Sequence, residues 1–363
     1  MPAPDQVLVS MSPGETRLAL MAADEVVELV VDRGGLATGD AVLGRVVGVN
    51  RALDAAFIDI GEARPGFLPG AGKLSEGTAV AVQVAAAARP DKGAALRRAA
   101  DQPETPAGKP PRRLGGLSPL ARLLAGMPAL PSVLADDAAT LAALRAEFPQ
   151  AVLDRDCFER LGAAEALDLA LDPLVPLADG GRLIIETTAA ATVIDIDSGG
   201  GAPLAANLAA VPAIARQLRL RAIAGHLLVD AIPLRRRQVL GQVVGALREA
   251  VAADPTPTHV MGVTPLGMIE LMRERRRPSL AEVMLDPPAC RPNPETLALA
   301  ALRAVLRHAD RRPAARPILA AAPAVIAALG RLGAALAETE GRLGRRLELR
   351  ADPAMERFEV MEG

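Results

Sequence analysis

Residues 192–200 read TVIDIDSGG, and residues 225–230 read GHLLVD. Each is an apolar stretch of strand length that reaches an aspartate near its end. Residues 204–221 between them have helical character, with Pro212 as an expected kink. A strand, a helix and a second strand are the unit from which parallel sheets are built. We therefore predict an α/β domain around these residues.

Three carboxylates lie at the ends of these two strands. Asp195 and Asp197 are two positions apart, so in a strand they point to the same face. If the strands are parallel neighbours, the right-handed crossover brings Asp230 to the same sheet edge, where open α/β sheets place their sites. Clustered carboxylates suit Mg²⁺, which prefers oxygen ligands. The alternative is that all three are solvated turn residues, and the pattern alone leaves this open.

Further elements are predicted along the chain from periodicity. In the first third of the chain we expect antiparallel strands at 16–22 and 25–31, a small barrel at 42–88 with strands 42–49, 54–61, 65–69 and 79–86, and a linker at 99–116. In the middle we expect an Asp-capped helix at 136–148, a strand at 226–233 with both faces covered, and helices at 237–253 and 266–276 around a strand at 259–264. From residue 293 we expect a small C-terminal α/β unit, with strands 317–323, 345–351 and 357–361 and a helix at 325–344.

Composition excludes some classes of protein. The 363 residues carry a net charge of only −2, which is not the overall signature of a nucleic-acid binder. No apolar run reaches the roughly 18 residues of a membrane span, and the first residues do not resemble a secretory signal. The two cysteines, Cys157 and Cys290, form no disulfide framework, so a reducing cytoplasm is expected.

Basic and aromatic residues are the remaining candidates for binding. Only three of the 41 basic residues are lysine, so phosphate contacts would rest mostly on arginine forks. Two arginine runs lie near the aspartates: Arg235, Arg236 and Arg237, and then Arg273 and residues 275–277. Such runs are otherwise solvated helix faces. Phe57 and Phe67 lie in the barrel segment and are either barrel core or stacking platforms for single-stranded bases, and Lys92 could contact a phosphate.

Several of these stretches resemble one family. GRVVGVNRALDAAFIDIG (44–61), GFLP (66–69) and KGAAL (92–96) resemble the OB-fold RNA-binding barrel of the RNase E/G family. RLIIETTAAATVIDIDSG (182–199), GHLLVD and GMIELMRERRRPSL (267–280) resemble its catalytic domain in order and spacing. GRRLELRADP (344–353) and FEV (358–360) resemble its small C-terminal domain.

The resemblance implies a multidomain α/β fold. An RNase H-like region (1–34 and 117–175) would hold an inserted OB-fold barrel (35–98), the linker 99–116 would replace a sensor domain, and a DNase I-like catalytic domain (176–285) and a small C-terminal domain (293–363) would follow. It also implies an endoribonuclease that hydrolyses single-stranded, A/U-rich RNA and leaves a 5′-phosphate and a 3′-hydroxyl. Asp195 and Asp230 match the family's Mg²⁺ ligands, Asp197 stands where the family has an orienting Asn, and Phe57 and Phe67 match RNA-contacting aromatics.

The sequence departs from the family at four places. The segment that senses a 5′-monophosphate is missing, and Pro265 replaces a further sensor arginine, so we expect cleavage that does not depend on the 5′ end. Only Cys290 stands near the family's paired-cysteine zinc link, so a homodimer would form without it. Pro233 replaces an acidic residue after the second aspartate.

Two other functions are compatible with parts of the pattern. One is a catalytically inactive single-stranded RNA-binding protein of the same family. Retention of three like charges argues against decay of the site. The other is a metabolic α/β enzyme, but the sequence has neither a dinucleotide-binding G-x-G-x-x-G turn nor a Walker-type phosphate loop.

Overall fold

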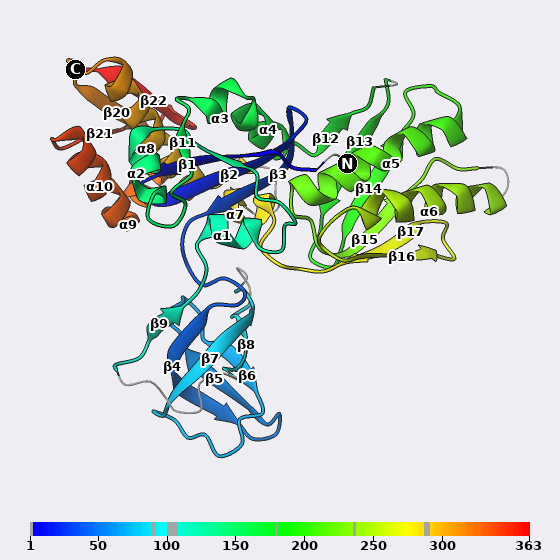
Figure 1. The fold of residues 1–363 in the computed structure, drawn as a ribbon, viewed down its shortest axis with the longest axis horizontal. Helices are drawn as coiled ribbons and strands as arrows, with labels where there is room; N and C mark the ends of the chain where they lie inside the picture. The colour runs from blue at the N-terminus through cyan, green and yellow to red at the C-terminus, as the bar shows by residue number, and fades with distance from the viewer. Residues whose placement is uncertain (1–2, 89–91, 100–107, 179, 235–236, 287–290) are drawn as a thin grey trace.

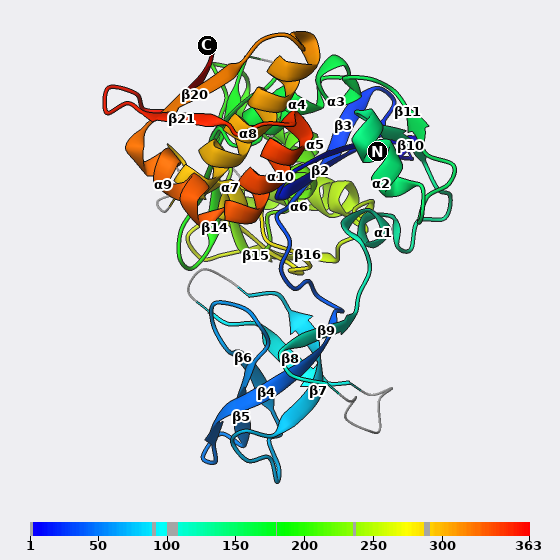
Figure 2. The ribbon, with the colours of Figure 1, turned by 90° about the vertical axis from the view of Figure 1, so that its left-hand side faces the viewer.

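The computed structural model describes residues 3–88, 92–99, 108–178, 180–234, 237–286 and 291–363. An elongated body carries the C-terminal helices and strands at one end and strands β12 to β17 at the other (Figure 1). The barrel projects from the middle of this body as a separate lobe, joined by the connections before β4 and after β9 (Figures 1 and 2). The chain is therefore an α/β protein of several packed units, as the sequence predicts.

A mixed sheet forms the centre of the body, in the order β11-β10-β1-β2-β3. Strands β1 to β3 are antiparallel neighbours, whereas β10 and β11 run parallel to β1. The elements of this unit are β1 (Gln6–Ser12), β2 (Glu15–Ala22), β3 (Glu25–Asp32), α1 (Pro119–Leu124), β10 (Ser132–Ala135), α2 (Ala138–Leu144), β11 (Val152–Leu153), α3 (Cys157–Arg160) and α4 (Ala163–Leu169). The predicted Asp cap of the second helix is Asp137, which accepts the Thr140 N–H at 2.7 Å. The sheet thus joins residues 6–32 to residues 132–153 around the inserted barrel.

The barrel is a closed ring of five strands, because β4 pairs with both β5 and β7 in the order β4-β5-β6-β8-β7. Its strands are β4 (Ala41–Asn50), β5 (Ala55–Asp59), β6 (Gly66–Pro69), β7 (Ala79–Ala86) and β8 (Ala95–Arg98). Gly66 is required where β6 meets β8, since a Cβ there would lie 2.5 Å from a Leu96 methyl. The strands predicted from short apolar runs are present.

The predicted linker 99–116 is not wholly a linker. Residues Arg112–Gly115 form strand β9, which adds to the barrel beside β4. Buried Asp40 pairs with Arg113 at 2.8 Å and accepts the Ala37 N–H at 2.8 Å, which fixes the base of the barrel. Residues 100–107 lie outside the described residues.

A second six-stranded sheet, in the order β12-β13-β14-β15-β17-β16, contains the predicted aspartates. Its elements are β12 (Leu174–Pro176), β13 (Arg182–Thr187), β14 (Thr192–Asp197), α5 (Pro203–Leu220), β15 (Gly225–Asp230), α6 (Arg237–Ala252), β16 (Thr258–Val263) and β17 (Ile269–Arg273). Helices α5 and α6 pack on one face and form a continuous apolar core with it.

The opposite face of this sheet is open. Along β15, Leu227 and Val229 are fully buried, whereas His226 and Asp230 are exposed. The prediction that both faces of this strand are covered is therefore wrong. Leu228 lies on the open side and is half-buried. Because this residue is apolar, the sequence of the strand resembles that of a strand buried on both faces.

The segment predicted as a helix at 266–276 contains strand β17 instead. Its residues alternate between buried and exposed, with Ile269 and Leu271 inside and Glu270 and Met272 outside. The strand fills the position between β15 and β16 and pairs with both. Pairing with two neighbouring strands outweighed a local pattern that also fits a helix.

The C-terminal unit packs helices against a small three-stranded sheet in the order β21-β20-β22. Its elements, with the connection that precedes it, are α7 (Leu280–Met284), β18 (Leu285–Asp286), β19 (Arg291–Pro292), α8 (Pro294–Arg311), β20 (Pro317–Ala321), α9 (Pro323–Arg331), α10 (Gly333–Leu343), β21 (Glu348–Ala351) and β22 (Phe358–Glu362). The single helix predicted at 325–344 is divided into two at Leu332, whose ψ of 38° departs from helical geometry.

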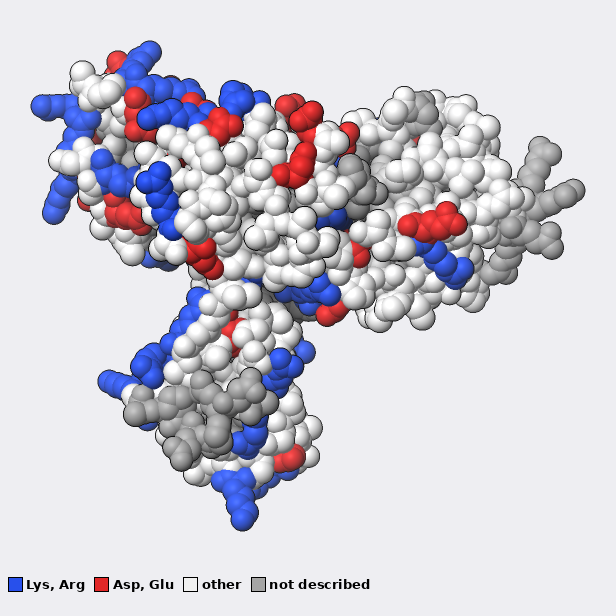
Figure 3. Space-filling view, in the orientation of Figure 1, with Lys and Arg blue, Asp and Glu red and all other residues white. Residues whose placement is uncertain are grey.

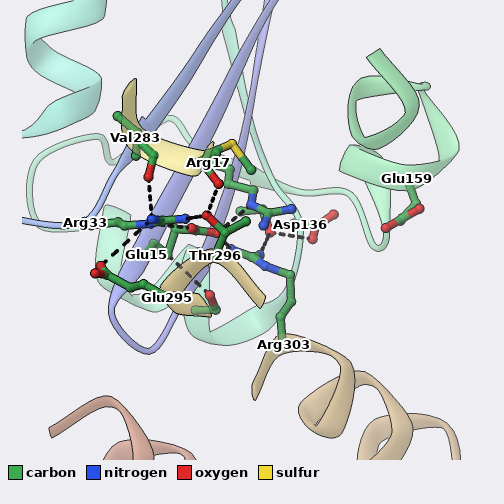
Figure 4. A network of polar contacts seen from close by, with 12 residues as sticks. Glu15, Arg17, Arg33, Asp136, Glu159, Val283, Glu295, Thr296 and Arg303 are labelled. Atoms are coloured by element: carbon green, nitrogen blue, oxygen red, sulfur yellow. Dashed lines mark hydrogen bonds and ion pairs between the residues drawn. The ribbon is translucent and has the colours of Figure 1, made fainter. Parts of the chain in front are cut away.

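Two buried glutamates hold the units together. Glu15 of β2 accepts ion pairs from Arg17, Arg33 and Arg303, the last reaching from α8 (Figure 4). Glu28 of β3 pairs with Arg219 of α5 at 2.9 Å and with Arg277 at 2.6 Å. Since a buried carboxylate is costly without partners, each glutamate makes the packing of its neighbouring units specific. Among the helices that the structure describes, none is both long and apolar enough to cross a membrane.

Candidate active site

Asp195 and Asp230 lie directly opposite each other on neighbouring strands. β14 and β15 are parallel and are joined by α5, and the register pairs Asp195 with Asp230. Neighbouring strands are about 4.8 Å apart, which sets the separation of the two backbones. Both side chains are exposed on the open face of the sheet. The convergence predicted from the crossover rule is therefore present as a pair of carboxylates.

Asp197 shares this face but is already engaged. Its carboxylate forms an ion pair with Arg182 of β13 at 2.9 Å, and it accepts the Gly199 N–H at 3.2 Å. Within the described ranges, no group of three His, Cys, Asp or Glu side chains could hold a metal ion. The predicted cluster of three carboxylates is thus reduced to a pair, with Asp197 beside it as a partner of Arg182.

The turn after β14 depends on glycine. Gly199 has φ +58°, and a Cβ on it would lie 2.4 Å from the Gly180 carbonyl oxygen. This close approach brings the turn against the neighbouring loop and places the Gly199 N–H under the Asp197 carboxylate. Glycine at position 199 is therefore required by the structure of this turn.

Asn207 fixes the loop that follows Asp230, and sequence reasoning did not single it out. Its side chain is fully buried in α5. Its amide donates to the Ile232 carbonyl at 2.9 Å and accepts the Ile232 N–H at 2.9 Å. Strand β15 ends at Asp230, and these two bonds take the place of strand pairing for the backbone N–H and carbonyl of Ile232. The signal was present, since a lone asparagine in an otherwise apolar helical segment needs a buried polar partner.

Glu270 is a further carboxylate on the open face that the sequence did not reveal. It lies on β17 opposite Leu228, one row along from Asp230, and it is exposed. Glu186 of β13 is also exposed on this face, opposite Val193. Because residues 266–276 were expected to form a helix, the position of Glu270 in the sheet could not be predicted.

Arg273 is not available to RNA, which corrects its prediction as a phosphate contact. It is 5% exposed and pairs with Asp254 at 2.7 Å. Burial, opposed by Asp254, lowers its pKa. The other three arginines of this run are also paired, Arg275 with Glu282, Arg276 with Glu274 and Arg277 with Glu28.

The other arginine run falls at the edge of the described chain. Arg235 and Arg236 lie outside the described residues, and Arg237 begins α6 without a described side chain. Their predicted phosphate contacts stay predictions.

Phe57 and Phe67 form an aromatic pair on the outside of the barrel. They are register partners on β5 and β6, with ring centroids 6.0 Å apart in an edge-to-face arrangement. Phe57 is 40% exposed and Phe67 is half-buried, while aliphatic side chains fill the barrel core. The interpretation as barrel core is therefore wrong for both. Lys92 is exposed just before β8.

The cysteines offer no described metal site. Cys157 is fully buried, and burial, with nearby Asp136 and Asp154, raises its pKa to about 12. Such a thiol is neutral and shielded, so it is a packing residue. Cys290, the one cysteine near the position of the family's zinc link, lies outside the described residues.

Comparison with known proteins agrees with this arrangement. The Ribonuclease E/G family matches residues 138–276, which include Asp195, Asn207 and Asp230. Ribonuclease G of Salmonella typhimurium (strain SL1344) and of Escherichia coli (strain K12) are each 31% identical over 221 residues, covering 56% of this chain and 45% of those proteins. Ribonuclease E of a Nostoc species is 40% identical over 134 residues, covering 34% of this chain and 20% of that protein.

The matched region thus spans less than half the length of the ribonuclease G relatives. It contains the sheet whose register pairs the two aspartates. Residues 138–276 of the chain therefore match the ribonuclease E/G family, and both aspartates lie inside this matched region.

Proposed function

We propose that the chain is an endoribonuclease that hydrolyses single-stranded, A/U-rich RNA at the Asp195–Asp230 pair and leaves a 5′-phosphate and a 3′-hydroxyl. The single observation that supports this most is the direct register of the two aspartates on an open sheet face. An open face admits a polymer, whereas a closed pocket would admit only its end. The relatives' name, ribonuclease, points to the same chemistry.

The residues present fit a Mg²⁺ ion. Two adjacent exposed carboxylates offer oxygen ligands and leave room for water and a substrate phosphate, which is how Mg²⁺ commonly binds in phosphoryl sites. Asp195 and Asp230 would hold the ion, and Asp197 with Arg182 would keep the end of β14 in place. When bound, such an ion supplies Lewis acidity, activating water and offsetting charge on the phosphodiester.

The barrel would bind the RNA strand. Its ring order and the parallel pairing of β6 with β8 support an OB-fold assignment. Phe57 and Phe67 offer exposed ring surface for base stacking, which contributes about 1–3 kcal/mol per base in such proteins. Among the charged side chains on the barrel face in view, most are basic (Figure 3), which suits a polyanion.

Cleavage should not depend on the 5′ end of the RNA. The family resemblance places Pro265 where a sensor arginine would be, and places residues 99–116, of which Arg112–Gly115 form β9, where a sensor segment would be. We expect equal rates on 5′-monophosphorylated and 5′-hydroxyl RNA in a cleavage assay. A large gain on the monophosphorylated substrate would contradict this part of the proposal.

The central experiment is a Mg²⁺ titration of cleavage on a single-stranded A/U-rich oligonucleotide. We expect Asp195→Asn and Asp230→Asn to lower the rate by about a hundredfold or more, as loss of a key charge-stabilising group does in other enzymes. Binding of the RNA should remain. Glu186→Gln is the matched control, because this carboxylate lies on the same open face without pairing opposite Asp195 or Asp230.

The alternative is a catalytically inactive RNA-binding member of the family. It would be adopted if the unmodified protein, saturated with Mg²⁺, bound the oligonucleotide and left it intact. Cleavage that persists in both aspartate variants would instead reject the assignment of the site.

A further inference from the structure

A cavity of about 640 Å³ lies between the N-terminal sheet and the C-terminal unit. Arg17 of β2 forms one wall, the last turns of α8 form another, and Phe358 at the start of β22 closes it. Helix α8 and strand β22 are at the opposite end of the body from β14 and β15 (Figure 1), so this cavity is separate from the aspartate pair. Its volume is in the range of sites for small ligands.

The walls of the cavity are strongly basic. Five of its eleven lining residues are arginine, and one, Glu359, is acidic. The arginines are Arg17, Arg303, Arg307, Arg311 and Arg312. Guanidinium groups bind phosphate through two parallel charge-assisted hydrogen bonds, so this lining favours a phosphate group over a neutral ligand.

Several of these arginines are held in place. Buried Glu15 pairs with Arg17 at 2.6 Å and with Arg303 at 3.3 Å (Figure 4), and Arg307 pairs with Glu159. Arg311, in contrast, is exposed and makes no ion pair with any residue that the structure describes. The cavity therefore combines fixed cations with one that is free to meet a ligand.

The same wall has unmet hydrogen-bonding capacity. Arg303 Nε and His308 Nε2 are buried, and neither has a hydrogen-bond partner within the described chain, although His308 Nε2 lies 3.7 Å from a Glu362 carboxylate oxygen. Arg303 is only 7% exposed. Buried polar atoms without partners are uncommon, and at a basic cavity they point to a ligand that completes them.

The acidic residues around the cavity favour a compact anion over a polymer. Carboxylates of Glu159, Glu359 and Glu362 stand beside the arginines, and Figure 3 shows acidic side chains among basic ones over this end of the molecule. They would repel a phosphate backbone that continued past the cavity. Phe358 is half-buried in the wall and offers apolar ring surface to a flat ring.

We propose that this cavity binds a small phosphate ester with a flat ring, a nucleoside monophosphate. The phosphate would meet Arg307 and Arg311, and the base would pack on Phe358. The proposal concerns binding at a second site and does not depend on cleavage at the aspartate pair.

The test is calorimetric titration of the full chain with AMP, adenosine and inorganic phosphate in turn. We expect AMP to bind more tightly than inorganic phosphate, and adenosine not to bind. Arg311→Gln and Arg307→Gln should each weaken AMP binding by roughly tenfold or more, since hydrogen bonds to charged groups are among the stronger ones. Phe358→Leu should weaken AMP binding and leave phosphate binding unchanged.

Arg331→Gln is the matched control. Arg331 and Arg311 both lie in the last turn of a helix, but Arg331 is outside the cavity. Unchanged melting temperatures of the variants would show that they fold. The proposal is overturned if AMP does not bind, if Arg331→Gln weakens binding as much as Arg311→Gln, if inorganic phosphate binds as tightly as AMP, or if a duplex RNA binds there and AMP does not compete.

Discussion

Replacement of Asn207 by leucine should disturb the proposed active site, although Asn207 is not one of its acidic residues. The change keeps a side chain of similar size in α5 and removes both hydrogen bonds to Ile232, each 2.9 Å long. Each bond contributes about 1 kcal/mol net, and a buried backbone group left without a partner costs about 1–3 kcal/mol, so we expect a loss of about 2–4 kcal/mol in the free energy of unfolding.

The loss should also affect cleavage. Ile232 is two residues beyond Asp230, so a released loop lets the end of β15 move relative to Asp195. A misplacement of about 1 Å in a catalytic group lowers rates by up to about a hundredfold. We therefore expect a lower maximal rate and a higher Mg²⁺ requirement in a cleavage assay, with RNA binding by the barrel unchanged.

The matched control is Gln217→Leu. Gln217 is the other buried amide of α5, and it accepts from Arg221 Nε at 2.6 Å, away from the aspartates. It should lower stability with little effect on cleavage at a temperature where both variants are folded. If Asn207→Leu is destabilised to a similar degree but cleaves at the unmodified rate, the idea that Asn207 positions the end of β15 is refuted.

Two further predictions concern buried titratable groups. Burial alone would raise the pKa of Glu28, but Arg277 and Arg219 lower this pKa below its ordinary value of 4.5. The ionised carboxylate therefore contributes its full stabilisation above pH 4.5, and this contribution is lost as the pH falls through the lowered pKa. The urea concentration at the midpoint of unfolding should consequently fall less in acid for Glu28→Gln than for the unmodified chain. Burial and neighbouring carboxylates raise the pKa of Cys157 to about 12. In a variant without Cys290, iodoacetamide should therefore label Cys157 no faster than the protein unfolds. Rapid labelling of the native protein at mildly alkaline pH would contradict the burial of Cys157.

The placement of the aspartate pair followed from the sequence because each step was local. Two apolar strands, a helix of crossover length and the handedness rule suffice to bring Asp195 and Asp230 to one edge. The barrel was equally accessible, since its short strands are separated by turn residues. The exposure of Phe57 could not be predicted in this way, because the alternation along a strand does not say which of its two faces points into the barrel.

The errors have one physical origin, which is partners distant in sequence. Residues Met268, Ile269, Leu271 and Met272 fit helical spacing as well as strand alternation, and pairing with β15 and β16 decides between them. Arg273 looked like part of a solvated charge run. Its burial depends on Asp254, a partner 19 residues away that the run itself does not reveal.

Helix α5 connects the proposed active site to the central sheet of the body. Near its start, Asn207 fixes the loop after Asp230, and near its end Arg219 pairs with Glu28 of β3. Strand β3 leads into the barrel through Asp32, which pairs with Arg122 at 2.7 Å. The Arg219–Glu28 pair thus ties the helix that carries Asn207 to the strand that precedes the barrel.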